Sequence, residues 1–240
     1  MSKYLFILLS MCALACSTPV DQSADAPGSI SLDPRHIRAN TLYFQVMFNE
    51  HPAGSMKVDC VREPQGWLVE EHTTLDANGN QEIIRTRMNH DFRPIVHEVR
   101  GMLEGNELDV QVHWEGDRIN GHSLFPRPPH KQQGQIDIER VLPPGTFERT
   151  STFYLLPAMP LSETAAFSFN WYNSLYAEIN QIQLKVTGLQ QVSVPAGTFE
   201  TYRVRLLGGA PDQTVYVSTQ APRKVVKIEV DDLPWRFELM

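Results

Sequence analysis

Residues 181–186 read Gln-Ile-Gln-Leu-Lys-Val, and this short run decides the fold class because apolar and polar side chains alternate at every position. A strand points successive side chains to opposite faces of a sheet, so Ile182, Leu184 and Val186 would share a buried face. A helix of the same sequence would scatter these three residues around its axis. The run therefore predicts a β-strand in a sheet that has one apolar face.

The same alternation recurs from Thr41 onward, in short runs bounded by Gly, Pro and Asn. The apolar members of the other clear runs are Leu42, Phe44, Val46 and Phe48; Met56, Val58 and Cys60; Leu108, Val110, Val112 and Trp114; Ala165, Phe167, Phe169 and Trp171; Tyr202, Val204 and Leu206; Val226, Ile228 and Val230; and Trp235, Phe237 and Leu239. Frequent turn signals, of which Asn78-Gly79 is the strongest, favour hairpins over β-α-β units. We predict an all-β fold with residues 41–240 as a single domain: a curved antiparallel meander sheet, half-barrel or sandwich-like, with at most one or two short helices.

Two segments of the body interrupt this pattern. Ser151 to Met159 is the candidate helix, with Thr150 or Ser151 as its N-cap and Pro157 at its end. The stretch from Gly121 to Gln135 contains three prolines, which predicts a long irregular loop and excludes a central strand. A loop of this length is either a surface excursion or a lid over a binding site.

The N-terminus has the layout of an export signal. Lys3 precedes an apolar run over residues 4–14 that is too short to span a bilayer and is followed by small residues, so we expect residues 1–15 to be a signal peptide. Ala13-Leu14-Ala15-Cys16 resembles the lipobox of bacterial lipoproteins, although Leu is usual where Ala13 stands. The resemblance implies that Cys16 carries diacylglycerol and that the protein is anchored in the outer membrane of a bacterial cell envelope, facing the periplasm. The alternative is an ordinary peptidase site that releases a soluble periplasmic protein.

Residues 16–40 follow the expected cleavage site and contain three prolines and few apolar side chains. This composition predicts a flexible tether between a lipidated Cys16 and the β domain.

Composition and charge exclude several functions. The chain has 240 residues, of which 42% are hydrophobic and 20% are charged, which is typical of a globular protein and not of a disordered or fibrous one. A net charge of −7 leaves no general basic surface, so nucleic acid is not an expected partner. The same charge would repel an anionic bilayer, and the lipid anchor is therefore the expected contact with the membrane.

A turn element occurs twice, as PPGTFE over residues 143–148 and PAGTFE over residues 195–200, with a weaker copy, PAGSM, over residues 52–56. Proline presets one backbone φ angle and glycine adopts a left-handed conformation, so each copy is expected to be a reverse turn before a new strand. The second copy lies in VSVPAGTFET, residues 192–201, ahead of Tyr216-Val217-Ser218 and the lysine-bearing strand after Pro222.

This arrangement resembles a bacterial envelope family of unknown function that carries a V-x-V-P-A-G-T-F-x-T strand-turn-strand. The resemblance covers about residues 145–230. It implies an exported, curved antiparallel sheet, broadly similar to the half-barrels that hold acyl chains in lipoprotein-sorting proteins. It carries over no catalytic residue, because none is established for the family.

No metal site, cofactor or catalytic residue is predicted from the chain itself. All eight histidines lie between His36 and His130 without the closely spaced pairs that zinc sites use, so we expect independent surface histidines. Gly121-His122-Ser123 approaches the G-x-S-x-G motif of hydrolases, but the final glycine is missing. A hydrolase that uses Ser123 is therefore the weakest of our functional hypotheses.

Two further residue types need an interpretation. Cys60 alternates with Met56 and Val58, which predicts a buried, unreactive thiol; the alternative is a cysteine that pairs between chains. Adjacent carboxylates such as Glu70-Glu71 should point to opposite faces of a strand, and we expect them to be solvated charges.

The aromatic side chains of the apolar face decide between two main hypotheses. They can line a pocket for an apolar ligand or fill a dry core, and the candidate ligand-binding residues are Phe44, Phe48, Trp114, Phe167, Phe169 and Trp171. The first hypothesis is a membrane-tethered, non-enzymatic envelope lipoprotein that holds a lipid or another hydrophobic ligand on its curved sheet. The second is a structural or interaction protein with a solid core, whose partner is another envelope protein bound at an edge strand.

Overall fold

The computed structural model describes residues 30–76, 79–103, 105–127, 132–209 and 211–240. The expected signal peptide and Cys16 lie outside these residues. The strands are β1 (Asn40–Phe48), β2 (His51–Glu63), β3 (Gly66–Leu75), β4 (Asn80–Met88), β5 (Pro94–Leu103), β6 (Asn106–Glu115), β7 (Arg118–Arg127), β8 (Gln132–Val141), β9 (Phe147–Glu148), β10 (Ala166–Asn173), β11 (Glu178–Val194), β12 (Gly197–Leu207), β13 (Gln213–Ser218), β14 (Val225–Val230) and β15 (Trp235–Leu239). The helices are α1 (Arg149–Leu155) and two 3₁₀ turns, η1 (Pro34–His36) and η2 (Leu156–Ala158).

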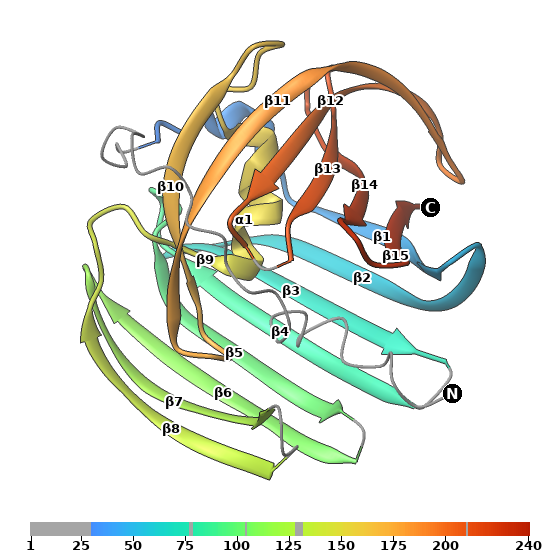
Figure 1. The fold of residues 1–240 in the computed structure, drawn as a ribbon. Helices are drawn as coiled ribbons and strands as arrows, with labels where there is room; N and C mark the ends of the chain where they lie inside the picture. Colours follow the sequence, from blue (N-terminus) through green and yellow to red (C-terminus); the bar gives the residue numbers. More distant parts are fainter. Residues whose placement is uncertain (1–29, 77–78, 104, 128–131, 210) are drawn as a thin grey trace.

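The strands form one curved sheet in the order β8-β7-β6-β5-β4-β3-β2-β1-β15-β14-β13-β12-β11-β10-β9 (Figure 1). Neighbouring strands run antiparallel, except that β9 pairs with β10 in parallel. The first and last strands of the chain meet, with Phe44 opposite Leu239 and Phe48 opposite Trp235. The predicted all-β fold, a curved antiparallel meander with one short α-helix, is confirmed.

The sheet curls around α1, which lies on its concave side together with η2 (Figure 1). Glu148 caps α1 by accepting hydrogen bonds from the backbone N–H groups of Thr150 (2.7 Å) and Ser151 (3.1 Å). The sequence predicted Thr150 or Ser151 as the N-cap. The cap is a glutamate instead, since its carboxylate reaches the N–H groups that the first turn leaves unpaired.

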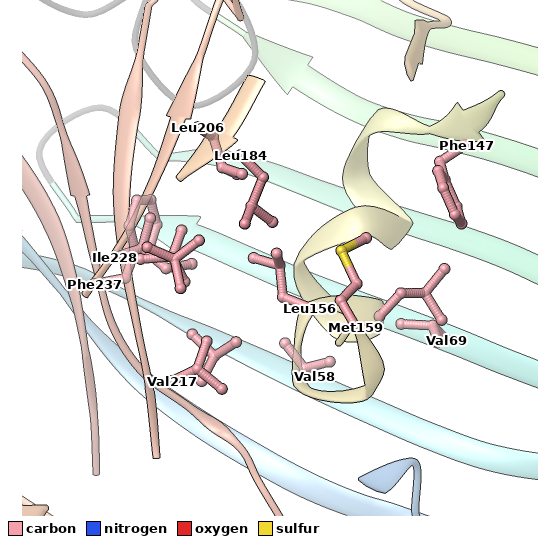
Figure 2. Close-up of a cluster of buried hydrophobic side chains, with 14 of the residues drawn as sticks. Val58, Val69, Phe147, Leu156, Met159, Leu184, Leu206, Val217, Ile228 and Phe237 are labelled. Carbon is pink, nitrogen blue, oxygen red and sulfur yellow. The ribbon is translucent and has the colours of Figure 1, made fainter. Parts of the chain in front are cut away.

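Two apolar cores fill the concave side. The larger lies between β1–β3, β10–β15 and the helices, and Figure 2 shows Leu156 and Met159 between side chains of the two sheet halves, among them Val58 and Leu184. The smaller core lies between β4–β8 and the turn that joins β10 to β11, where Trp114 and Tyr172 make an edge-to-face contact with ring centroids 5.9 Å apart. The cavity described below borders the larger core, and side chains of that core, among them Val58 and Phe237, also line the cavity.

The prediction of an irregular loop from Gly121 to Gln135 is wrong over most of its length, because β7 and β8 pair there and place Gly121 opposite Ile138. Gly121 permits the close approach of β7 to its other neighbour β6, since a Cβ at that position would lie 1.9 Å from the Gln111 carbonyl oxygen. Sequence reasoning treated Gly121 as a residue that ends a strand, whereas a glycine is required at this position so that neighbouring strands can approach closely.

Two smaller expectations also differ from the structure. Ile30, Leu32 and Ile37 pack against the larger core, so the chain is part of the domain from residue 30 and not from residue 41 as predicted. The weak third copy of the turn element, residues 52–56, lies within β2, whereas the other two copies precede β9 and start β12. No helix in the described residues is long and apolar enough to cross a membrane.

Candidate functional site

A cavity of about 540 Å³ lies between the concave face of the sheet and α1. This volume falls within the range of small-molecule sites, roughly 300–1,000 Å³. Strands β1 to β4 and β12 to β15 contribute to its walls, and most of the side chains that they contribute are apolar, including Phe44, Met56, Val58, Ile228 and Phe237. The period-two pattern of the sequence explains this surface, because each of these residues belongs to the apolar face of its strand.

Three buried polar side chains of the cavity wall each have an atom without a hydrogen-bond partner in the described part of the chain. Glu82 of β4, Arg149 of α1 and Gln213 of β13 are 5%, 6% and 6% exposed. Within the described part of the chain, Glu82 Oε2, Arg149 Nε and Gln213 Oε1 have no hydrogen-bond partner. Unsatisfied buried polar atoms cost about 1–3 kcal/mol each, so they are rare in native proteins unless a ligand or water completes them.

Glu71 and Tyr154 connect the sheet to the helix within the cavity wall. The Tyr154 hydroxyl donates a hydrogen bond to Glu71 Oε2, and the Thr73 hydroxyl donates to Glu71 Oε1 at 3.0 Å. Burial raises the pKa of Glu71 despite these two bonds. Burial, with the nearby Glu71 as a second cause, raises the pKa of Glu82 well above its ordinary value. Both carboxyl groups are therefore shifted toward the neutral form.

The opening of the cavity is marked by its exposed lining residues, which are 38–40, before and at the start of β1, and 220–222, in the turn between β13 and β14. Residues next to these two segments are joined, because the Arg223 backbone N–H donates to His36 Nδ1 at 3.3 Å. Burial, followed by the charge of Arg223, lowers the pKa of His36, which keeps this nitrogen available as an acceptor. We call Arg38, Arg223 and Lys224 the mouth cations, since all three line the cavity at this opening.

Of the six predicted ligand-binding residues, the structure places Phe44 in the cavity wall. Phe48 contacts Trp235 with ring centroids 4.8 Å apart, and Trp114 lies in the smaller core. Phe167 packs against the larger core, where Phe169 meets Phe147 at 5.6 Å and Trp171 lies 5.7 Å from the Arg149 guanidinium. The candidate residues are thus spread over two cores and one cavity wall.

The wall contains polar residues that sequence reasoning missed. Glu71 was expected to be a solvated charge; only its neighbour Glu70 faces outward, where it pairs with Arg85 and His72. The sequence did contain a pattern that indicates burial of Glu71, because this residue falls in the inward-facing series Val69, Glu71, Thr73, Leu75. A carboxylate in an apolar series predicts a buried polar site, and the same reasoning applies to Glu82 beside Ile84.

Cys60 is 9% exposed and lines the cavity, in agreement with the predicted buried thiol. Burial raises the pKa of this thiol to about 11. The reactive thiolate is therefore a minor species at neutral pH.

The serine proposed for a hydrolase lies away from the cavity. Ser123 is fully buried in β7 and donates its hydroxyl hydrogen bond to the Leu175 carbonyl oxygen at 2.7 Å. His122 points to the opposite face, where its Nε2 lies 3.3 Å from Asp109 Oδ2. A nucleophile needs its base within hydrogen-bond reach, and strand geometry separates these two side chains.

Histidines and acids do not converge on a metal position anywhere in the residues described by the structure. The buried pair His97 and Glu148, with Nε2 and Oε1 3.5 Å apart, lies at the start of α1 and fixes the helix to β5.

Comparison with known proteins agrees with this architecture. The chain belongs to the DUF3108 family, described as proteins of unknown function, whose model matches residues 45–233. The crystal structure of a β-barrel-like protein from the domain of unknown function DUF1849 of Brucella abortus has a similar fold, with a TM-score of 0.54 and 8% sequence identity over 85% of this chain and 96% of that chain. No match was found among curated proteins. The comparisons establish the family and the fold.

Proposed function

We propose that this member of the DUF3108 family is a non-enzymatic binding protein of the bacterial envelope that holds a lipid or another amphipathic molecule between its curved sheet and α1. One observation carries the proposal: the cavity of about 540 Å³ combines apolar walls with three buried polar side chains that have unpartnered atoms among the described residues. Apolar walls with a few placed polar groups are the usual composition of a small-molecule site.

The energetics favour occupation of this cavity. Apolar walls that face water lose roughly 25 cal/mol for every Å² left uncovered, and a hydrophobic ligand recovers this free energy when it displaces the water. A ligand with polar groups would also complete the hydrogen bonds that Glu82 and Gln213 lack. An amphipathic molecule meets both requirements, whereas a fully polar molecule meets only the second.

The location in the envelope rests on the sequence. Residues 1–15 have the features of a signal peptide, and Cys16 is the proposed site of lipid attachment, which would hold the domain at the outer membrane. Replacement of Cys16 by Ala should move the protein from the membrane to the soluble fraction. If the Cys16→Ala protein stays in the membrane fraction, the proposed anchor is wrong.

Binding is tested with the uncharged fluorescent probe N-phenyl-1-naphthylamine. We expect saturable binding to the native protein that is lost in Val58→Trp, because the indole would occupy the cavity next to α1. Val61→Trp is the matched control, since Val61 lies on the same strand and is 46% exposed. Native mass spectrometry of protein gently extracted from its source membranes should detect a bound lipid.

Two outcomes would reject the proposal. One is the absence of saturable probe binding together with a ligand-free mass spectrum. The other is equal binding by the two tryptophan variants, which would place the probe on the surface. Either result would favour the alternative of a structural envelope protein.

A further inference from the structure

We propose that the bound molecule is an anionic amphiphile, with its acyl chain in the cavity and its carboxylate or phosphate head held at the opening by the mouth cations Arg38, Arg223 and Lys224. This inference rests on the proposed function and identifies the class of ligand. It starts from a contrast in charge between the chain and its cavity.

The chain carries a net charge of −7, yet the cavity wall is basic. Its charged lining consists of four cations, namely the mouth cations and Arg149, against the two carboxyl groups of Glu71 and Glu82. Both carboxyl groups are shifted toward the neutral form by burial. The cavity therefore offers a positive potential to its contents within a negative protein.

The mouth cations have no carboxylate within 4.0 Å in the described part of the chain. The closest acid in sequence is Asp33, which is engaged by Arg35 through side-chain bonds of 2.7 to 3.1 Å. A set of cations at a cavity opening without internal counter-charges is suited to an external anion.

Arg223 is already held in position for such a contact. Its guanidinium lies 5.2 Å from the centroid of the Tyr202 ring, and its two terminal nitrogens are 3.4 Å from the carbonyl oxygens of Met159 and Leu161. Its Nε is buried and has no acceptor among the described residues. A fixed side chain loses little entropy when an anion supplies the missing acceptor.

Lys224 is placed in a similar way. Its Nζ lies 4.6 Å from the centroid of the Phe199 ring, and both residues line the cavity. This cation–π contact positions the ammonium group, and its N–H donors that point away from the ring can bind an oxygen atom at the opening.

The interior is a poorer position for the anionic head. Arg149 interacts with the charge of Glu82, which in turn interacts with Glu71. Among the lining cations, an anion placed there would face only Arg149, whose charge already interacts with Glu82, whereas at the opening it would face three cations. The acyl chain of the ligand therefore points inward and the charged head remains at the mouth, while water molecules or uncharged polar groups of the ligand would complete the hydrogen bonds of Glu82 and Gln213.

The experiment compares four amphiphiles of equal chain length as competitors of N-phenyl-1-naphthylamine: dodecanoate, dodecyl phosphate, dodecanol and dodecyltrimethylammonium. We expect at least one of the two anions to bind about tenfold more tightly than the alcohol, because each charge-assisted hydrogen bond at the mouth adds affinity. The cation should bind more weakly than the alcohol. The two anions separate a carboxylate head from a phosphate head, and inorganic phosphate alone should not displace the probe.

The matched variants locate the head group. The double variant Arg38→Gln with Lys224→Gln should reduce the preference for anions to less than about threefold, while Lys185→Gln, an exposed cation outside the cavity, should retain it in full. Arg149→Gln should retain a clear preference. Arg223→Gln is informative only with a melting curve, since Arg223 also contacts the chain after η2.

Equal affinities for dodecanol and the anions would overturn the inference while leaving the proposed function intact. Loss of the preference in Arg149→Gln, but not in the double mouth variant, would overturn the orientation. If none of the four amphiphiles displaces the probe and the probe itself does not bind, the proposed function fails instead.

Discussion

Tyr154 of α1 donates a hydrogen bond to the Glu71 carboxylate of β3, and the two residues face each other in the wall of the cavity. The bond connects α1 to the sheet beside the cavity, where the apolar side chains of the helix and the sheet are not in contact. Because burial raises the pKa of both groups, the pair is a polar contact within an otherwise apolar surface. The shape of the cavity depends on this contact, since α1 is one of its walls.

Replacement of Tyr154 by Phe should destabilise the protein by about 1–3 kcal/mol, because the Glu71 carboxyl loses a partner while remaining buried. Urea unfolding at neutral pH measures the effect. The control is Tyr43→Phe, since Tyr43 is 53% exposed. Equal unfolding midpoints for the two variants would contradict the structural role of the bond.

The contribution of Glu71 and Glu82 to stability should decrease as the pH rises above about 4.5, the ordinary pKa of a glutamate. The folded-state pKa values of Glu71 and Glu82 are raised, so the folded protein holds these protons more tightly than the unfolded chain. Their contribution is complete below the unfolded pKa and is lost as the pH passes through the folded pKa.

The variant Glu82→Gln isolates this contribution, because glutamine cannot ionise. We expect its stability relative to the native protein to increase steadily between pH 5 and pH 8 in urea titrations, on the scale of the linkage relation. His97, whose pKa is lowered by burial, affects both proteins equally and cancels in the difference. A constant difference across the range would mean that Glu82 is already ionised in the folded state.

Replacement of Glu148 by Ala should cost about 1–2 kcal/mol, since α1 loses the cap formed with the N–H groups of Thr150 and Ser151. Glu148→Gln keeps an oxygen in the same place and should retain most of the stability in urea unfolding. If the glutamine variant is as unstable as the alanine variant, the contact with His97 would be the dominant interaction instead.

Cys60 should react slowly with a maleimide at pH 8 in the native protein and rapidly in urea. Its pKa of about 11, against an ordinary value of 9.0, lowers the thiolate fraction roughly hundredfold. Because Cys60 lines the cavity, dodecanoate should slow the reaction further. Mass spectrometry of the peptide that contains Cys60 measures the rate, and native labelling as fast as in urea would contradict its burial.

Much of the fold follows from local pattern. The alternation in Ile182, Leu184 and Val186 predicts a buried strand face, and all three side chains are buried in β11. The Asn78-Gly79 signal predicts a hairpin, and Leu75 pairs with Asn80 across that turn, with Gly79 at a φ of 62°. Such features depend on neighbours in the chain, so a single sequence contains them.

The candidate site depends on contacts that local pattern does not encode. Phe44 was identified because it lies on an apolar face, but the same criterion selected Trp114 and Phe169, which are buried in the cores and do not line the cavity. The position of α1 decides whether an inward-facing aromatic residue contacts another side chain or lines the cavity. This helix is distant in sequence from many of the strands that it packs against.

The sequence alone determined the strand content, the inward face of most strands and the burial of Cys60, because each follows from the two-residue period of a strand. Only the tertiary structure decided that β1 pairs with β15, that α1 lies inside the curl, and that Glu71, Glu82 and Arg149 share one cavity. The curvature of the sheet and the pairing of β1 with β15 bring these residues together. The curvature results from small twists between neighbouring strands that add up over 15 strands, so it cannot be predicted from any short segment of the sequence.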